Sequence, residues 1–225
     1  LDIGEMGIFR KKFLDESISN LQENLKVFGL KLNIFEGDIV KIFDEVRSKF
    51  KSDNVYGSKE VGWYEQDEEK RLASNKFNLN LYDDQFLIET DKLPYTIGDL
   101  PLVFTHFRKK VEKLVQIRDE VKISNKKFEI KNYDFEYETS NESGEIEINK
   151  NSNFPFVGGE TSALKRLDSY LWGDNRIKKY KETRNGLIGT EYSSKFSSFL
   201  SLGCISPVTI YHEIKRYEKK IIKNS

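Results

Sequence analysis

Cysteine and histidine are scarce in this chain of 225 residues, which contains one cysteine, Cys204, and two histidines, His106 and His212. A single cysteine excludes an internal disulfide. One cysteine and two histidines also argue against a structural zinc site, because such sites take four Cys or His ligands, and no metal site is predicted. Cys204 stands among apolar neighbours, and we expect it to be a small buried residue.

Long apolar runs are missing as well. No stretch approaches the length of a membrane-spanning helix, and no signal peptide is visible. The first residue is Leu1 and not methionine, so the sequence does not decide targeting. Hydrophobic residues make up 37% of the chain and charged residues 33%. This composition predicts one or two soluble domains in an intracellular protein, cytoplasmic if it is bacterial.

The formal net charge is zero, but the charges are unevenly distributed. Residues 159–225 carry 13 Lys and Arg against 7 Asp and Glu, a net charge of +6, and the other 158 residues therefore carry −6. A basic C-terminal part suits a polyanionic partner, although a lysine-rich helix face is also common on solvated surfaces. Residues 134–149 contain six acids and no Lys or Arg, which predicts a solvated linker loop.

Hydrophobic periodicity predicts helices and strands in alternation. The helical pattern covers residues 7–28, 38–50, 66–75, 104–117, 160–173, 193–202 and 207–222. The strand pattern covers residues 30–36 and 54–56, and residues 77–88 form a strand or a hairpin around Asp83 and Asp84. Helix and strand alternation in the first part predicts a parallel α/β sheet, whereas helices dominate from residue 159 onward.

The most informative segment is 180–207, YKETRNGLIGTEYSSKFSSFLSLGCISP. It contains a run of serines that the pattern places at the start of a helix, with the aromatic side chains of Phe196 and Phe199 on the core side. Hydroxyls and free N–H groups at a helix start form an anion site that suits a diphosphate. An ordinary helix cap is the alternative interpretation.

Several motifs resemble the photolyase and cryptochrome family, in particular the DASH-type cryptochromes. They are Gly158-Gly159-Glu160-Thr161 with Ala163-Leu164, YKETRNGL at 180–187, SSKFS at 193–197 and LSLGCISP at 200–207. Upstream, GIFRKKFLDESI at 7–18, Leu93-Pro94 and LPLVFTHFRK at 100–109 are similar to the family too. The match follows the family order over nearly the whole chain and is weakest between residues 110 and 155.

The resemblance implies an α/β fold joined to helices. Residues 1–92 would form the C-terminal part of a Rossmann-like parallel α/β antenna domain, residues 93–158 the interdomain linker, and residues 159–225 the N-terminal part of an all-helical FAD-binding domain. Family members are considerably longer, so we expect an internal piece that contains no catalytic residue. We also expect residues 159–225 alone to be partly molten, because their apolar faces would lack partners.

The resemblance also implies a flavin site. Ser193, Ser194, Lys195, Phe196 and Ser197 fall on the run that meets the FAD phosphates in the family, where Lys195 would add a point charge. Tyr180 falls on a flavin-contacting tyrosine of the family. The alternative for Tyr180 is an aromatic residue at a helix end that packs on Leu187.

Two further positions match functional residues of the family. Arg184 matches a contact to DNA phosphate, and its alternative is a surface ion pair with Glu182 or Glu191. Glu60 matches the glutamate that contacts an antenna folate, 5,10-methenyltetrahydrofolate. Its surroundings depart from the family pattern at Trp63 among others, and the alternative is an ordinary surface acid.

The activity that the resemblance implies is that of a deoxyribodipyrimidine photo-lyase, for the intact protein. Excited reduced FAD would transfer an electron to a cyclobutane pyrimidine dimer, chiefly in single-stranded DNA, where unpairing costs little. We expect a monomer with no membrane partner. A blue-light photoreceptor that signals without repair is the alternative, and a helical binding module with a serine-rich cap is the third interpretation.

Overall fold

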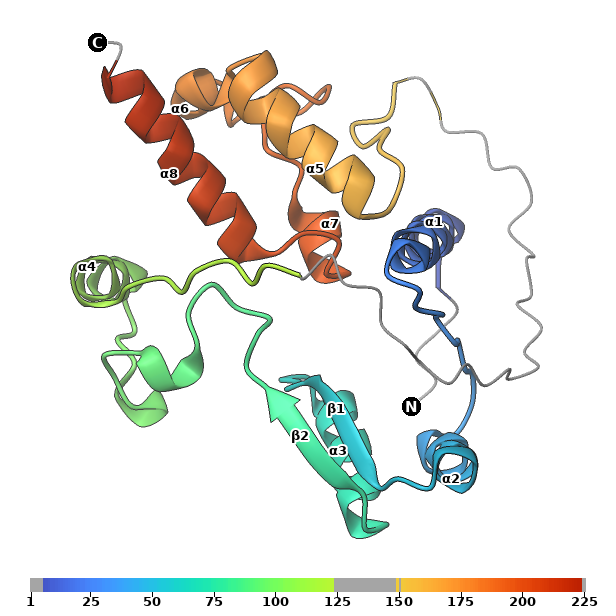
Figure 1. Ribbon diagram of the computed structural model, residues 1–225. Helices are drawn as coiled ribbons and strands as arrows, with labels where there is room; N and C mark the ends of the chain where they lie inside the picture. Colours follow the sequence, from blue (N-terminus) through green and yellow to red (C-terminus); the bar gives the residue numbers. More distant parts are fainter. Residues whose placement is uncertain (1–5, 124–148, 150, 224–225) are drawn as a thin grey trace. The chain divides into compact units, whose positions relative to one another are not determined.

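The computed structural model describes residues 6–123, 149 and 151–223. Its contacts divide the chain into two units (Figure 1). One unit holds the described residues of Leu1–Ile34 and Lys122–Ser225, and the other is Phe35–Val121. No helix within these described ranges is long and apolar enough to cross a membrane.

The unit Phe35–Val121 is built around a small parallel sheet. In order it contains α2 (Ile39–Phe50), β1 (Asn54–Ser58), α3 (Trp63–Ser74), β2 (Asn78–Tyr82), the short 3-10 helices η1 (Thr90–Lys92) and η2 (Ile97–Asp99), and α4 (Phe104–Leu114). Strands β1 and β2 pair in parallel, from Asn54 opposite Asn78 to Ser58 opposite Tyr82. Parallel strands need a crossover, which α3 supplies. The predicted parallel α/β arrangement is confirmed.

Asp38 joins two helices of this unit. Its carboxylate caps α2 by accepting hydrogen bonds from the N–H groups of Val40 and Lys41, both at 3.1 Å. The same side chain forms an ion pair with Arg71 of α3. The hydrogen bond from Arg71 is the main reason that the pKa of Asp38 lies below its usual value.

One prediction in the strand regions is confirmed and one is wrong. The segment 77–88 contains one strand, β2, which confirms the strand alternative. Its described residues form no hairpin, because the Asp83 carboxylate accepts a hydrogen bond of 2.7 Å from the Thr90 N–H and turns the chain into η1. Residues 30–36 alternate like a strand but pair with no other strand in the part of the chain that the structure describes. Alternation shows a two-sided environment and not the presence of a partner strand.

The other unit is helical, as predicted for its C-terminal part. It contains α1 (Ile8–Val27), α5 (Glu160–Asp168), the π-helical turn η3 (Ser169–Gly173), the 3-10 helix η4 (Arg176–Lys179), α6 (Tyr180–Thr183), α7 (Ser197–Ser201) and α8 (Pro207–Lys223). Its core consists of Phe13, Ala163, Leu167, Tyr170, Leu171, Phe196, Phe199, Cys204, Ile205 and Tyr217. Cys204 is buried, which confirms that prediction.

Helix α1 packs on the C-terminal helices through two glycines. A Cβ at Gly158 would lie 2.2 Å from the Phe13 carbonyl oxygen, and one at Gly159, where φ is +101°, would lie 2.5 Å from Asn20 Cβ. Phe13 meets Phe199 edge to face at 5.4 Å between ring centroids. The contacts therefore group α1 with residues 149–223, whereas the sequence-based division into 1–92, 93–158 and 159–225 stays a prediction.

Candidate functional site

The serine-rich segment is a loop followed by a very short helix. Helix α7 begins at Ser197, so the predicted helix start at residue 193 is wrong. The reason is local: Lys195 is left-handed with φ +62°, which interrupts helical geometry before Phe196 returns to φ −81° and ψ −15°. We call residues 190–197 the serine loop.

The three serine hydroxyls of the serine loop are uncommitted among the described residues, whereas the Thr190 hydroxyl donates to the Glu191 carboxylate at 2.9 Å. Ser197 is exposed, and Ser193, Ser194 and Lys195 are half-buried. Within the described residues, the three serine hydroxyls make no hydrogen bond and the N–H groups of 194–197 donate to no acceptor, in contrast with Ser201, whose Oγ donates to the Ser198 carbonyl. The loop thus presents donors that the fold itself does not use.

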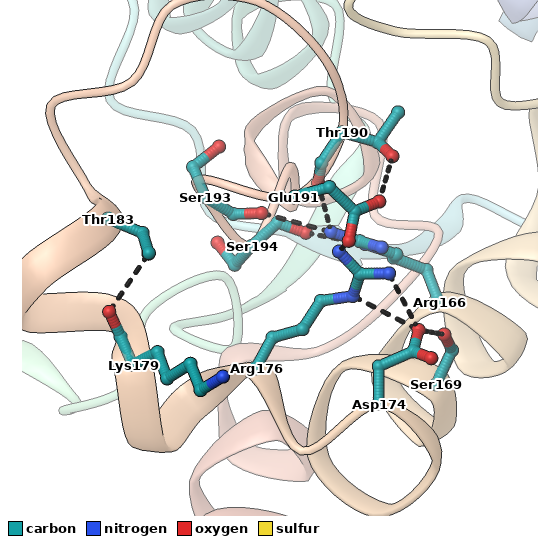
Figure 2. A network of polar contacts seen from close by, with 10 residues as sticks. All are labelled: Arg166, Ser169, Asp174, Arg176, Lys179, Thr183, Thr190, Glu191, Ser193 and Ser194. Carbon is teal, nitrogen blue, oxygen red and sulfur yellow. Dashed lines mark hydrogen bonds and ion pairs between the residues drawn. The ribbon is translucent and has the colours of Figure 1, made fainter.

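The carbonyls of the loop face a buried cation, Arg166 of α5 (Figure 2). Its Nε donates to the Ser194 oxygen at 3.1 Å, and its Nη2 donates to the oxygens of Thr190 at 2.8 Å and Ser193 at 3.0 Å. The Arg166 side chain is only 6% exposed. Burial, reinforced by the charge of nearby Arg176, lowers the pKa of Arg166 from its usual value.

A second group of charges surrounds this contact (Figure 2). Arg176 pairs with Asp174 at 3.0 Å and also with Glu191 of the serine loop. Asp174 accepts a hydrogen bond of 2.9 Å from the Ser169 hydroxyl, and this bond, followed by those from Arg176, keeps the pKa of Asp174 below its usual value. Glu191, one alternative partner of Arg184, is therefore paired with Arg176.

The aromatic candidates differ in what they offer a ligand. The Phe196 ring is buried and meets Tyr170 edge to face at 6.0 Å, so only the main chain of residue 196 is available at the surface. Tyr180, the first residue of α6, is 43% exposed. Leu187 is 83% exposed, which argues against the alternative that Tyr180 packs on it.

Arg184 and Glu60 lie outside the serine loop, and no hydrogen bond or ion pair between either residue and the loop is found among the described residues. Arg184 follows α6, is exposed, and forms no ion pair within the described part of the chain. Glu60 follows β1 in the unit Phe35–Val121. Its carboxylate accepts a hydrogen bond of 2.7 Å from Gln85, and its N–H donates to the Glu69 carboxylate at 3.0 Å.

A pocket of about 1110 Å³ opens beside α7 within the helical unit. Aromatic side chains from α1 and from 149–156 line it, together with the serines of α7: Phe9, Phe13, Phe154, Phe156, Ser197, Ser198 and Ser201. Of the predicted site residues, only Ser197 contributes to this lining. The pocket therefore reaches the end of the serine loop but is not formed by it.

Sequence reasoning missed Arg166. A signal was present, because Arg166 occupies a position in α5 that its neighbours Ala163, Leu167 and Tyr170 mark as the buried face. A cation in the middle of an apolar helix face needs partners inside the fold. The partners themselves lie 24 to 28 residues further along the chain, and no spacing rule reveals them.

Comparison with known proteins gives a consistent set of matches. Residues 2–125 match the family model for DNA photolyase. Cryptochrome DASH of Synechocystis sp. is 36% identical over 97% of this chain, and cryptochrome DASH of Danio rerio is 37% identical over 94%. The alignments cover 46% and 43% of those relatives, so the chain spans about half the length of the curated relatives it matches.

Solved structures give the same result. The crystal structure of a Synechocystis sp. cryptochrome superposes with a TM-score of 0.86 at 36% identity, over 95% of this chain and 46% of that one. A class III photolyase from Agrobacterium tumefaciens has a TM-score of 0.78 over 100% of this chain and 50% of that one. At 21% identity, the second match concerns the fold alone.

Proposed function

The chain belongs to the photolyase and cryptochrome family, in its DASH branch, and we propose that the full protein is a FAD-dependent enzyme that repairs cyclobutane pyrimidine dimers with light. The observation that carries the cofactor assignment is the serine loop. Three of its carbonyls face Arg166, and the hydroxyls of Ser193, Ser194 and Ser197 and the N–H groups of 194–197 are uncommitted within the described residues. We propose residues 1–92, 93–158 and 159–225 as antenna-domain part, linker and start of the FAD-binding domain.

The serine loop fits the diphosphate of FAD. Hydroxyl and N–H donors around a left-handed residue suit an anion, since a left-handed residue beside a right-handed one brings successive N–H groups to the same side. Hydrogen bonds to ionised phosphate oxygens are stronger than those between neutral groups. In this proposal Ser193, Ser194 and Ser197 donate from their hydroxyls, Lys195 adds a positive charge, and residue 196 contributes its main chain.

Tyr180 has the complementary role of contacting the flavin with its exposed ring. When bound in its reduced form, FAD supplies the chromophore and the transferable electron. The residues of this chain hold the cofactor and orient it, and none of them is assigned to the chemical step.

The DNA contact is proposed for the surface that begins at η4 and continues through α6. Arg184 is exposed there, and the neighbouring lysines Lys178, Lys179 and Lys181 are exposed as well. A guanidinium free of ion pairs within the described residues is suited to a phosphate oxygen. We propose single-stranded DNA as the substrate, because an unpaired base leaves its stack at a lower cost than a paired one.

Glu60 is proposed to contact an antenna folate, 5,10-methenyltetrahydrofolate. The side chain is half-buried, and the hydrogen bond from Gln85 fixes the orientation of the carboxylate. A carboxylate oriented in this way accepts hydrogen bonds from amino and ring N–H groups of a pterin. Its second oxygen supplies the acceptor for that contact.

A blue-light photoreceptor that binds FAD and signals without repair is the second candidate. The curated relatives carry the name cryptochrome, which favours this possibility. The two candidates share the cofactor and differ in the event that light absorption triggers. Repair changes the DNA, whereas signalling changes the binding of a protein partner.

The test is spectroscopic first and enzymatic second. We expect the purified full-length protein to show the structured blue absorption of flavin. After photoreduction it should restore thymines from a dimer in a single-stranded oligonucleotide under blue light and not in the dark. Equal restoration in light and dark would overturn the repair proposal. A light-dependent change in partner binding without repair would favour the photoreceptor.

A further inference from the structure

Arg166 is the one charged side chain that is buried among the described residues. It forms no ion pair within them, because the nearby acids Asp174 and Glu191 pair with Arg176 instead. A buried guanidinium is costly unless its donors are satisfied. Nε and Nη2 of Arg166 donate to three main-chain oxygens of the serine loop, so the hydrogen bonds of this guanidinium within the described residues all hold one loop.

The three bonds set the direction of the peptide groups. In a trans peptide the carbonyl and the N–H point in opposite directions, and the structure contains no cis peptide in its described part. Since the oxygens of Ser193 and Ser194 point at Arg166, the N–H groups of Ser194 and Lys195 point away from it. The left-handed conformation of Lys195 then continues the turn toward Phe196.

We infer that Arg166 is a positioning residue for the diphosphate site, which holds the serine loop with its carbonyls inward and its donors outward. The inference rests on the proposed function, because the ligand of the loop is the diphosphate of FAD. A loop ordered before binding loses less conformational entropy when the ligand arrives. The positive charge of Arg166 behind the loop also favours an anion in front of it.

The test is a titration of the full-length apoprotein with FAD, monitored by quenching of flavin fluorescence. Arg166→Met removes the guanidinium and keeps an unbranched chain in its place. We expect the Kd for FAD to rise roughly 30-fold or more, since several hydrogen bonds to a charged group are lost. Lys165→Met removes the same charge from the exposed neighbouring position of α5 and should change the Kd by no more than about two-fold.

Two more readouts separate positioning from a purely structural role. The ³¹P resonances of FAD bound at saturation should shift in Arg166→Met and stay unchanged in Lys165→Met. Arg166→Met should also be combined with alanine at Ser193, Ser194 and Ser197. Because the loss of Arg166 and the loss of the serine hydroxyls act through the same contacts, their effects should not add. The Kd of the combined variant should exceed the Kd of the weaker-binding parent variant by no more than about three-fold. Independent losses would multiply instead.

The outcomes are distinct. Unchanged Kd and ³¹P resonances in a folded Arg166→Met protein, or losses that multiply, would overturn the inference and leave the proposed function standing. If circular dichroism shows that Arg166→Met does not fold, Arg166→Lys takes its place. It retains the charge without the planar fork, and unchanged FAD affinity in it would overturn the inference as well. A wild-type protein that binds no FAD would overturn both proposals.

Discussion

The serines of the loop are distinguished by what their hydroxyls do not contact. Ser169 and Ser201 use their hydroxyls on Asp174 and on the Ser198 carbonyl, as structural serines commonly do. Ser193, Ser194 and Ser197 have no such partner among the described residues. Hydroxyls that the fold leaves free in this way can donate hydrogen bonds to an anion, as we propose for the diphosphate of FAD.

Alanine at Ser193, Ser194 and Ser197 together should weaken FAD binding strongly. Each hydrogen bond to a charged group contributes roughly 1.5–3 kcal/mol, so the triple variant of the full-length protein should lose several kcal/mol of binding free energy. Isothermal titration of the apoprotein with FAD measures this loss. Ser201→Ala is the control, because its hydroxyl donates within α7. Unchanged affinity in the triple variant would show that the site lies elsewhere.

Arg184→Ala should weaken DNA binding and leave FAD binding unchanged. The loss of one phosphate contact reduces the slope of log K against log salt by about 1 and lowers affinity for all sequences alike. Fluorescence anisotropy of a labelled single-stranded oligonucleotide at several salt concentrations measures both quantities. Arg108→Ala, an exposed arginine of α4 paired with Glu112, is the charge-matched control. An equal slope in wild type and Arg184→Ala would remove Arg184 from the DNA contact.

At this scale the sequence predicts chemistry better than geometry. The serine run and the basic positions can be identified from the sequence, because their residue types are unusual at those positions. The prediction that Phe196 and Phe199 lie on the core side is confirmed. The sequence does not reveal the left-handed Lys195, because lysine has no preference for that conformation. Arg166 is missed for a related reason, because its hydrogen-bond partners belong to a loop that lies 24 to 28 residues further along the chain.

At the scale of elements, helices with a long periodic pattern are predicted well. The pattern at 38–50 corresponds to α2 and the pattern at 207–222 to α8, each within about one residue. Ends and short elements are less predictable, because caps and distant contacts decide them. The predicted helix 160–173, for example, becomes α5 and a π-helical turn, in which Tyr170 and Leu171 remain buried.

The contact between α1 and α5 should depend on the absence of a side chain at Gly158. In Gly158→Ala the added methyl would lie 2.2 Å from the Phe13 carbonyl oxygen and 2.5 Å from Ser17 Oγ, and the backbone cannot yield easily. Overpacking of this kind costs roughly 1–3 kcal/mol, which we expect to find in the free energy of unfolding. Urea denaturation of the full-length protein measures it.

Gly173→Ala provides the matched control for this glycine. Beyond its chain neighbours and the backbone of its own helix, no atom of the described residues lies within 4 Å of the added methyl, and the expected change in unfolding free energy is below about 0.5 kcal/mol. Equal midpoints for wild type and Gly158→Ala would show that α1 and α5 are not in close contact in solution.

For the chain as a whole, the order of helices along the sequence does not determine which helices pack together. Helix α1 lies near the beginning of the sequence, but its Phe13 completes a core whose other members lie between Ala163 and Tyr217. The resemblance places α1 with the α/β part, and its contacts place it with the helices. Sequence order predicts which elements exist, whereas a buried ring such as Phe13 decides what they pack against.

The helical unit should therefore require α1 in order to fold. Residues 151–223 alone should expose the faces of Phe154 and Phe199 that Phe13 contacts, and should therefore bind a hydrophobic dye and lack near-ultraviolet circular dichroism. Joining residues 6–28 through a flexible linker should restore a cooperative thermal transition. The same fusion with Phe13→Ala should lose it, because removing a buried phenylalanine costs roughly 3–5 kcal/mol. Cooperative folding of residues 151–223 alone would show that the core forms without α1.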